Sequence, residues 1–181
     1  TVQHLASVLA SSGGISSISC LLINNNNFST LPGGAGSNNS AFRYIKLTNS
    51  LDLSYNQISY IEPYAFWGQS QLKYLYLKGN KINYLKRETF SGLSNLLYLD
   101  LDSNNVGYYS ASLDLVFSDL ASLNYLVLSN NGVGDRALTN ATFAGLTRLI
   151  LLYLKNNWLK VEQTAGIFAP LGQLTHLDLS Y

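Results

Sequence analysis

Cysteine, histidine, methionine and charged residues are scarce in this chain of 181 residues. A single cysteine, Cys20, excludes an intrachain disulfide and any zinc or iron–sulfur site built from several cysteines. The two histidines, His4 and His176, lie at opposite ends of the sequence, and no HExxH, GxSxG or P-loop motif occurs. The longest apolar runs are too short to span a bilayer, so no membrane span is expected in this segment.

Charge is also low, since only 12% of the residues are charged and the formal net charge is +1. A typical soluble domain carries about a quarter of charged residues. The near-zero net charge offers no electrostatic basis for binding nucleic acid or an anionic membrane, so we expect no nucleic-acid partner. The polar surface must instead consist mainly of Asn, Ser, Gln, Thr and Tyr.

A short apolar pattern recurs along the chain, and the segment from Leu72 shows it most clearly. Leu72, Leu75 and Leu77 precede a marker asparagine, Asn80, and Ile82 follows it. The markers are Asn26, Asn56, Asn80, Asn104, Asn131 and Asn157, at intervals of 30, 24, 24, 27 and 26 residues. A phenylalanine follows most markers by 10 to 13 residues, at Phe66, Phe90, Phe117, Phe143 and Phe168. Such a fixed period indicates a stack of repeats rather than a conventional globular domain.

The pattern resembles the leucine-rich repeat family, LxxLxLxxNxL, in its extracellular subtype of about 24 residues, over residues 18–179. The resemblance implies an α/β solenoid, a horseshoe or arc with a parallel β-sheet on its concave face and short helices or loops on its convex face. We expect about six full repeats and one truncated repeat over residues 17–181. Residues 1–16 are expected to form a helical cap or the return limb of an incomplete repeat. The cysteine-rich caps found in many extracellular members are absent.

In each repeat the leucines of the LxL core should point into the coil, while the intervening residues point outward. The marker asparagines should bind backbone groups left free where the chain leaves each strand, forming a ladder along the stack. The repeat around 106–117 is longer than its neighbours, and its LDLVF segment could form an extra helical turn.

The outward strand positions place five tyrosines on one face. Tyr74, Tyr98 and Tyr125 should form a column, with Tyr76 and Tyr153 beside it. One interpretation is an aromatic surface that binds a protein or glycan partner; the other is that Tyr simply suits exposed strands. Asp100 and Asp102 share this face, but two carboxylates without converging carbonyls make a weak cation site, so no metal or cofactor is expected. His176, Asp178 and Ser180 resemble a catalytic triad only in composition, since a flat strand offers no nucleophile elbow and no oxyanion donors, so we expect no enzymatic activity.

Three N-x-S/T sequons begin at Asn27, Asn38 and Asn140. They favour an extracellular or cell-surface glycoprotein, whose sugars would offset the low surface charge.

Neither end of the repeat array carries an obvious polar cap. Val2, Leu5 and Leu9 form one apolar end, and the truncated repeat of Leu174, Leu177 and Leu179 forms the other. Joining these ends between copies preserves the repeat spacing, which would produce an open filament. The sequence therefore supports two hypotheses, a recognition module that uses the concave face and a structural subunit of a glycosylated extracellular filament.

Overall fold

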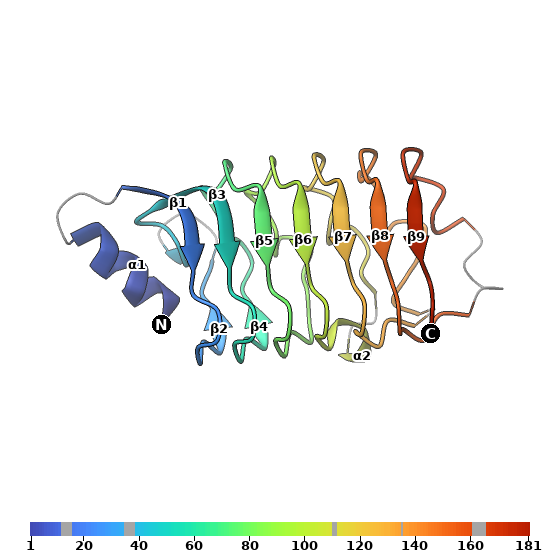
Figure 1. The fold of residues 1–181 in the computed structure, drawn as a ribbon, viewed down its shortest axis with the longest axis horizontal. Coiled ribbons are helices and arrows are strands. Elements are labelled where there is room, and N and C mark those ends of the chain that lie inside the picture. Colours follow the sequence, from blue (N-terminus) through green and yellow to red (C-terminus); the bar gives the residue numbers. More distant parts are fainter. Residues whose placement is uncertain (12–15, 35–38, 110–111, 135, 161–165) are drawn as a thin grey trace.

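The computed structural model describes residues 1–11, 16–34, 39–109, 112–134, 136–160 and 166–181. Within this part of the chain, seven parallel strands lie side by side in the order β1-β3-β5-β6-β7-β8-β9, and each belongs to one coil of a solenoid (Figure 1). The strands are β1 Ser17–Leu22, β3 Lys46–Asp52, β5 Tyr74–Tyr76, β6 Tyr98–Asp100, β7 Tyr125–Val127, β8 Leu151–Tyr153 and β9 His176–Asp178. The expected parallel-sheet solenoid is thereby confirmed.

Three smaller elements complete the fold. A second, two-stranded sheet pairs β2 Thr30–Leu31 with β4 Tyr60–Ile61. Helix α1, Val2–Ser11, lies at the amino-terminal end of the stack, and the short helix α2, Val106–Tyr109, lies at the edge beyond the carboxyl ends of the strands (Figure 1). No helix in the described ranges is long and apolar enough to cross a membrane.

The leucines of successive strands form a buried row through the centre of the stack. The register pairs Leu51 with Leu75, Leu75 with Leu99, and Leu99 with Leu126. All four side chains are fully buried, whereas the residues on either side of each leucine are partly or fully exposed. This alternation follows from the two-residue period of a strand, and it buries apolar surface that no single repeat could cover alone.

The marker asparagines bridge neighbouring coils. Asn80 donates its side-chain amide to the carbonyl oxygens of Leu77 in its own coil and Leu53 in the preceding coil, and its side-chain oxygen accepts from the backbone N–H of Ile58. The same arrangement recurs at Asn56, Asn104, Asn131 and Asn157. The amide of Asn26, in the first coil, donates within that coil, to Ile23 and Asn24. The ladder satisfies backbone groups at the strand ends that water cannot reach.

Phenylalanines line the opposite side of the coils, and all but the partly buried Phe168 are fully buried. Their rings stack at centroid separations of 6.0–6.3 Å from Phe42 through Phe66 and Phe90 to Phe117, and again between Phe143 and Phe168. Since neighbouring rings belong to different coils, this column joins the repeats on the side away from the sheet.

The helical turn of the longer repeat lies nearer the amino terminus of that repeat than expected. The helical turn is α2, while LDLVF at 113–117 is not helical. Two backbone amides at the start of α2 have partners in the next coil, because Val106 N–H donates to the Asn131 side-chain oxygen and Gly107 N–H to the Asn131 carbonyl. These bonds supply acceptors for amides that a helix leaves unsatisfied at its amino end.

The two ends of the stack differ in exposure. Val2 of α1 is only 1% exposed because it packs into the core of its own chain, while Leu5 and Leu9 are partly buried. At the other end Leu177 is 39% exposed, and Leu179 is similarly open, although the equivalent leucines in the coils of β3 to β8 are buried. As placed, Val2 therefore offers no surface to another molecule, whereas Leu177 and Leu179 do.

Candidate functional site

The strand register places the five tyrosines on the outer face of the seven-stranded sheet. One row runs through Cys20, Ser50, Tyr74, Tyr98, Tyr125, Leu151 and His176. The neighbouring row runs through Leu22, Asp52, Tyr76, Asp100, Val127, Tyr153 and Asp178. We call the surface formed by Tyr74, Tyr76, Tyr98, Tyr125 and Tyr153 the tyrosine face.

Tyr98 lies at the centre of the ring contacts on this face. Its ring centroid is 6.2 Å from that of Tyr125 in the same row and 5.2 Å from that of Tyr76 in the neighbouring row, with the rings tilted by 38° and 43°. Within the described residues, Tyr74 makes no ring contact with Tyr98. One aromatic contact, Tyr98–Tyr125, therefore follows a row, whereas the other, Tyr76–Tyr98, crosses diagonally between the two rows.

Burial and nearby negative charge hold the central phenol in its neutral form. Burial, followed by the charge of Asp100, raises the pKa of Tyr98 to about 12. Burial also raises the pKa of Tyr76, with Tyr74 and Asp52 adding to the effect. Tyr76 and Tyr98 thus contribute aromatic surface and neutral hydroxyl groups to the tyrosine face.

A small polar network borders the tyrosines. Asp102 forms a salt bridge with Lys78 (Oδ2–Nζ 3.0 Å) and accepts a hydrogen bond from the side-chain amide of Asn130 at 2.6 Å. Burial alone would raise the pKa of Asp102, but the bonds from Asn130 and Lys78 lower it. Burial and the neighbouring Asp102 charge raise the pKa of Asp100, whose Oδ1 accepts from the Asp102 backbone N–H at 2.9 Å. The two carboxylates therefore have distinct electrostatic environments.

The titratable side chains at the carboxyl-terminal end of this face make separate local contacts. No group of three or more His, Cys, Asp or Glu side chains suited to a metal ion is found among the described residues. The His176 ring is hydrogen-bonded to Thr175 at 2.8 Å, and Asp178 accepts from the Ser180 backbone, so these residues do not form a relay. Cys20 is an exposed thiol whose pKa is lowered by hydrogen bonds from Ser50, Asn49 and Ser19.

The three sequons lie away from the tyrosine face or outside the described residues. Asn27 and Asn140 are exposed in the segments that connect strands. Asn38 lies outside the described residues. Thr142, the third residue of its sequon, is buried, and its hydroxyl accepts from the Thr139 backbone N–H at 2.9 Å.

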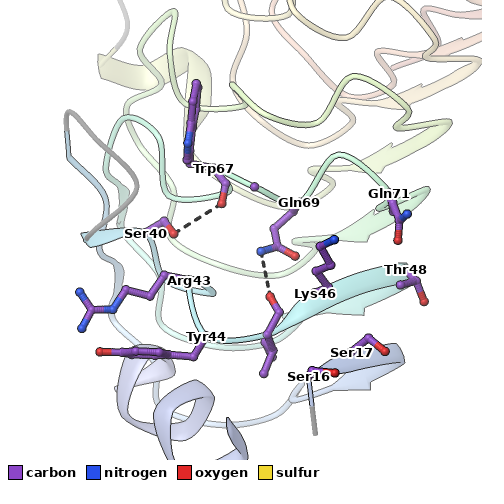
Figure 2. Close-up of a pocket in the computed structure, with 12 residues that line it drawn as sticks. Ser16, Ser17, Ser40, Arg43, Tyr44, Lys46, Thr48, Trp67, Gln69 and Gln71 are labelled. Atoms are coloured by element: carbon purple, nitrogen blue, oxygen red, sulfur yellow. Dashed lines mark hydrogen bonds between the residues drawn. The ribbon is translucent and has the colours of Figure 1, made fainter.

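A basic groove at the amino ends of the strands was not expected from the sequence. Its first part, of about 1070 Å³, contains Arg43, Lys46 and Trp67, and the guanidinium of Arg43 lies 4.2 Å from the Tyr44 ring centroid (Figure 2). Gln69 forms its floor by donating to the carbonyl oxygens of Phe42 and Ile45. A second part, of about 480 Å³, shares Thr48 and Gln71 with the first and adds two more cations. The four cations are Arg43, Lys46, Lys73 and Arg148.

The lining of this groove contains no aspartate or glutamate among the described residues. The sequence carried only a weak signal for it: Lys46 begins β3, Lys73 directly precedes β5, and Arg148 lies three residues before β8. The overall net charge of +1 gives no sign of this local excess of cations.

Comparison with known proteins agrees with the architecture. The sequence profile described as "Leucine rich repeat" matches residues 16–82, 48–106 and 78–133. Toll-like receptor 3 of Boselaphus tragocamelus is 30% identical over 150 residues, which are 78% of this chain and 16% of the receptor. Among solved structures, the TLR13–ssRNA13 complex has a TM-score of 0.62 at 26% identity, covering 89% of this chain and 26% of that one.

The leucine-rich repeat domain of APL1 is similar to a comparable degree, with a TM-score of 0.65 at 25% identity over 91% of this chain and 46% of that one. The chain thus spans less than half the length of each of these relatives. The matched repeats, the parallel sheet and the asparagine ladder lead to one conclusion: the chain belongs to the leucine-rich repeat family.

Proposed function

We propose that this protein is a non-enzymatic recognition module that binds a protein partner through the tyrosine face. The observation that carries the proposal is the connected group of Tyr76, Tyr98 and Tyr125, whose rings contact one another on three adjacent strands. Strands hold these rings in place before binding, so little side-chain entropy is lost when a partner covers them. Aromatic side chains of this kind supply most of the binding energy at many protein interfaces.

Relatives add support at the level of the family. The curated relative is named as a receptor, and the recognition role proposed here is consistent with that name. Because the chain spans 16% of that receptor, the activity of the whole receptor is not carried over.

Site-specific photo-cross-linking tests the tyrosine face. A photoreactive phenylalanine analogue placed at Tyr125 or Tyr153 should capture one protein from the native medium, whereas the analogue at Tyr84 should not. Tyr84 is a matched control because it is exposed but lies outside the two rows of the face. The captured protein should then bind the Tyr98→Ala variant with at least about tenfold lower affinity, because this variant lacks the central ring. Equal capture at Tyr84, or unchanged affinity for Tyr98→Ala, would overturn the proposal.

Nucleic acid is not the partner that we propose, although one similar structure is titled as a complex with ssRNA13. The basic groove is the surface best suited to nucleic acid, because its described lining contains cations and no carboxylates. Titration with a fluorescent single-stranded RNA at low salt decides the matter. Salt-sensitive binding that is lost in a Lys73→Ala/Arg148→Ala double variant would contradict the expectation.

We also propose extracellular placement with N-glycans at Asn27 and Asn140. Both side chains are exposed and belong to sequons, and a glycan at either position would leave the outer sheet face accessible. Native protein should decrease in mass after enzymatic deglycosylation, and peptide mapping should place the lost mass at these two residues. An unchanged mass contradicts this part of the proposal.

The alternative function is head-to-tail assembly into a filament. It is supported by Leu177 and Leu179, which are exposed where the leucines of earlier strands are covered by the next coil. Either a following coil of the same polypeptide or a second copy of the chain could cover this surface, so the native protein must be examined. Negative-stain images should show short arcs under the recognition proposal. Long uniform threads that disappear in Leu177→Asp would instead establish the filament.

A further inference from the structure

Two exposed aromatic rings meet beside helix α2. That helix lies at the edge of the solenoid beyond the carboxyl ends of the strands (Figure 1). Tyr108 of α2 is 54% exposed and Trp158 is 56% exposed, yet their ring centroids are only 4.7 Å apart. The rings are inclined at 76°, so they form a corner that is open to solvent. Exposed aromatic surface of this size at one spot is a common feature of binding sites.

The local backbone brings Tyr108 into this corner. A Cβ atom on Gly107 would lie 2.4 Å from the Gly132 carbonyl oxygen, so only glycine allows α2 to approach the next coil this closely. A Cβ atom on Gly132 would lie 2.5 Å from the Tyr108 ring, and Gly132 has a φ of 64°. The ring of Tyr108 therefore rests directly against the backbone of Gly132. Both glycines, and the tryptophan that follows marker Asn157, belong to the array's carboxyl-terminal half.

Asparagine side chains surround the aromatic corner in a cleft of about 220 Å³. Asn156 donates to the Asn130 side-chain oxygen at 2.8 Å, and Asn130 donates to Asp102 at 2.6 Å. This chain of bonds orients Asn156 while leaving its own side-chain oxygen able to accept. Within the described residues the Asn105 side-chain amide makes no hydrogen bond, so it can serve both as donor and as acceptor.

The chemistry of the lining specifies the ligand. Its described residues are Asn104, Asn105, Tyr108, Asn130, Gly132, Asn156 and Trp158, and none is charged. A phosphate, sulfate or charged peptide would find no oppositely charged partner among them. A pyranose ring presents an apolar C–H face that can stack on an aromatic ring, while its hydroxyl groups can pair with planar amides. The small cleft volume suits one such ring, with the rest of a chain extending into solvent.

We propose that the Tyr108–Trp158 cleft binds one pyranose unit of a neutral oligosaccharide. The site is separate from the tyrosine face, so this proposal can be tested independently of the proposed protein partner. An open cleft of this kind corresponds to weak binding, with a dissociation constant of about 10 μM to 1 mM.

Intrinsic fluorescence provides a direct test, because Trp67 and Trp158 are the two tryptophans of the chain. In a Trp67→Phe background, Trp158 becomes the single reporter. Titration with cellotetraose, chitotetraose and mannotetraose should produce a saturable change for at least one of them. A sulfated tetrasaccharide, used as the anionic comparison, should produce none.

Variants locate the site. In the same background Tyr108→Ala should weaken binding at least about tenfold and Asn105→Ala several-fold, whereas Tyr84→Ala should bind as the background does. Thermal unfolding followed by circular dichroism verifies that each variant is folded; if Tyr108→Ala is not, Asn105→Ala carries the test. The proposal is overturned by the absence of any saturable response, by tighter binding of the sulfated sugar, or by unchanged affinity in the folded variants.

Discussion

The side-chain amide of Asn104 donates a hydrogen bond to the carbonyl oxygen of Leu77, which lies 27 residues earlier and one coil away, at 3.0 Å. The same amide binds the Leu101 carbonyl, and its oxygen accepts from the Ile82 backbone N–H, both at 3.0 Å. Asn104 is only 4% exposed, so water cannot replace these bonds. The asparagine ladder therefore joins the coils on the polar side much as the leucine row does in the core.

Replacing Asn104 with alanine should destabilise the protein strongly. The change leaves the buried Ile82 N–H without a partner and removes one of the two amide donors at each of the Leu77 and Leu101 carbonyls, which keep Asn80 and Asn131. We expect a loss of about 2–4 kcal/mol in the free energy of unfolding. Urea denaturation measures it. Asn26→Ala is the control because that side chain is exposed and bonds only within its own coil, so its loss should stay below about 1 kcal/mol. Equal losses at the two positions would contradict the bridging role.

Alkaline pH should destabilise the tyrosine face through Tyr98. Its pKa is raised to about 12, so the stabilisation from the neutral phenol is complete below about pH 10 and is lost as the pH rises toward 12. Tyrosinate absorbance should show a late ionisation step near pH 12 that is missing in Tyr98→Phe. Tyr84→Phe should retain the step. If Tyr98→Phe keeps it as well, the late step belongs to another of the 13 tyrosines.

Asp100 and Asp102 should respond to neutralisation with opposite signs. Since the pKa of Asp100 is raised, stability from its protonated form is present below about pH 4 and is lost as the pH rises through the folded pKa. Since the pKa of Asp102 is lowered, its contribution is present above about pH 4 and is lost as the pH falls through the folded pKa.

At pH 7, Asp100→Asn should therefore stabilise the protein slightly, while Asp102→Asn should destabilise it, each by up to about 1 kcal/mol. Asparagine keeps the single acceptor oxygen that Asp100 uses, whereas at position 102 it removes one of the two acceptors that bind Asn130 and Lys78. Chemical denaturation at pH 7 and at pH 3 compares the two variants with the parent, and the differences should shrink at the lower pH. Changes of the same sign at pH 7 would rule out the assignment of the two carboxylates.

Gly107→Ala should lower the melting temperature, because the added Cβ would lie 2.4 Å from the Gly132 carbonyl oxygen and the Val133 backbone. Relieving that overlap requires α2 to move away from the next coil, and we expect a loss of about 1–3 kcal/mol. Gly172→Ala is the matched control, since a Cβ there meets nothing within 4 Å. Differential scanning calorimetry should find that variant within about 0.5 kcal/mol of the parent. A neutral Gly107→Ala would mean that α2 does not need this close approach.

The repeat made much of the fold predictable. The two-residue period of each LxL core assigned its leucines to the interior, and equal spacing from core to marker aligned one coil with the next. For this reason the sequence predicts which residues pair in the rows through Tyr74 and Tyr76. The family and the solenoid followed from the same pattern.

Other features depend on how side chains and neighbouring coils approach one another in space. Rotamers decide that Tyr98 contacts Tyr76 diagonally, and packing of α1 decides that Val2 is buried. The basic groove arises because cations from separate repeats line one edge.

The sequence by itself determined the solenoid, its leucine core and the positions of its marker asparagines, because the constant spacing from each LxL core to its marker admits essentially one register. Only the tertiary structure decided where the longer repeat turns into a helix and that Tyr108 meets Trp158 across 50 residues of chain. That contact depends on the close approach of Gly107 to Gly132, a distance between coils that no local pattern encodes.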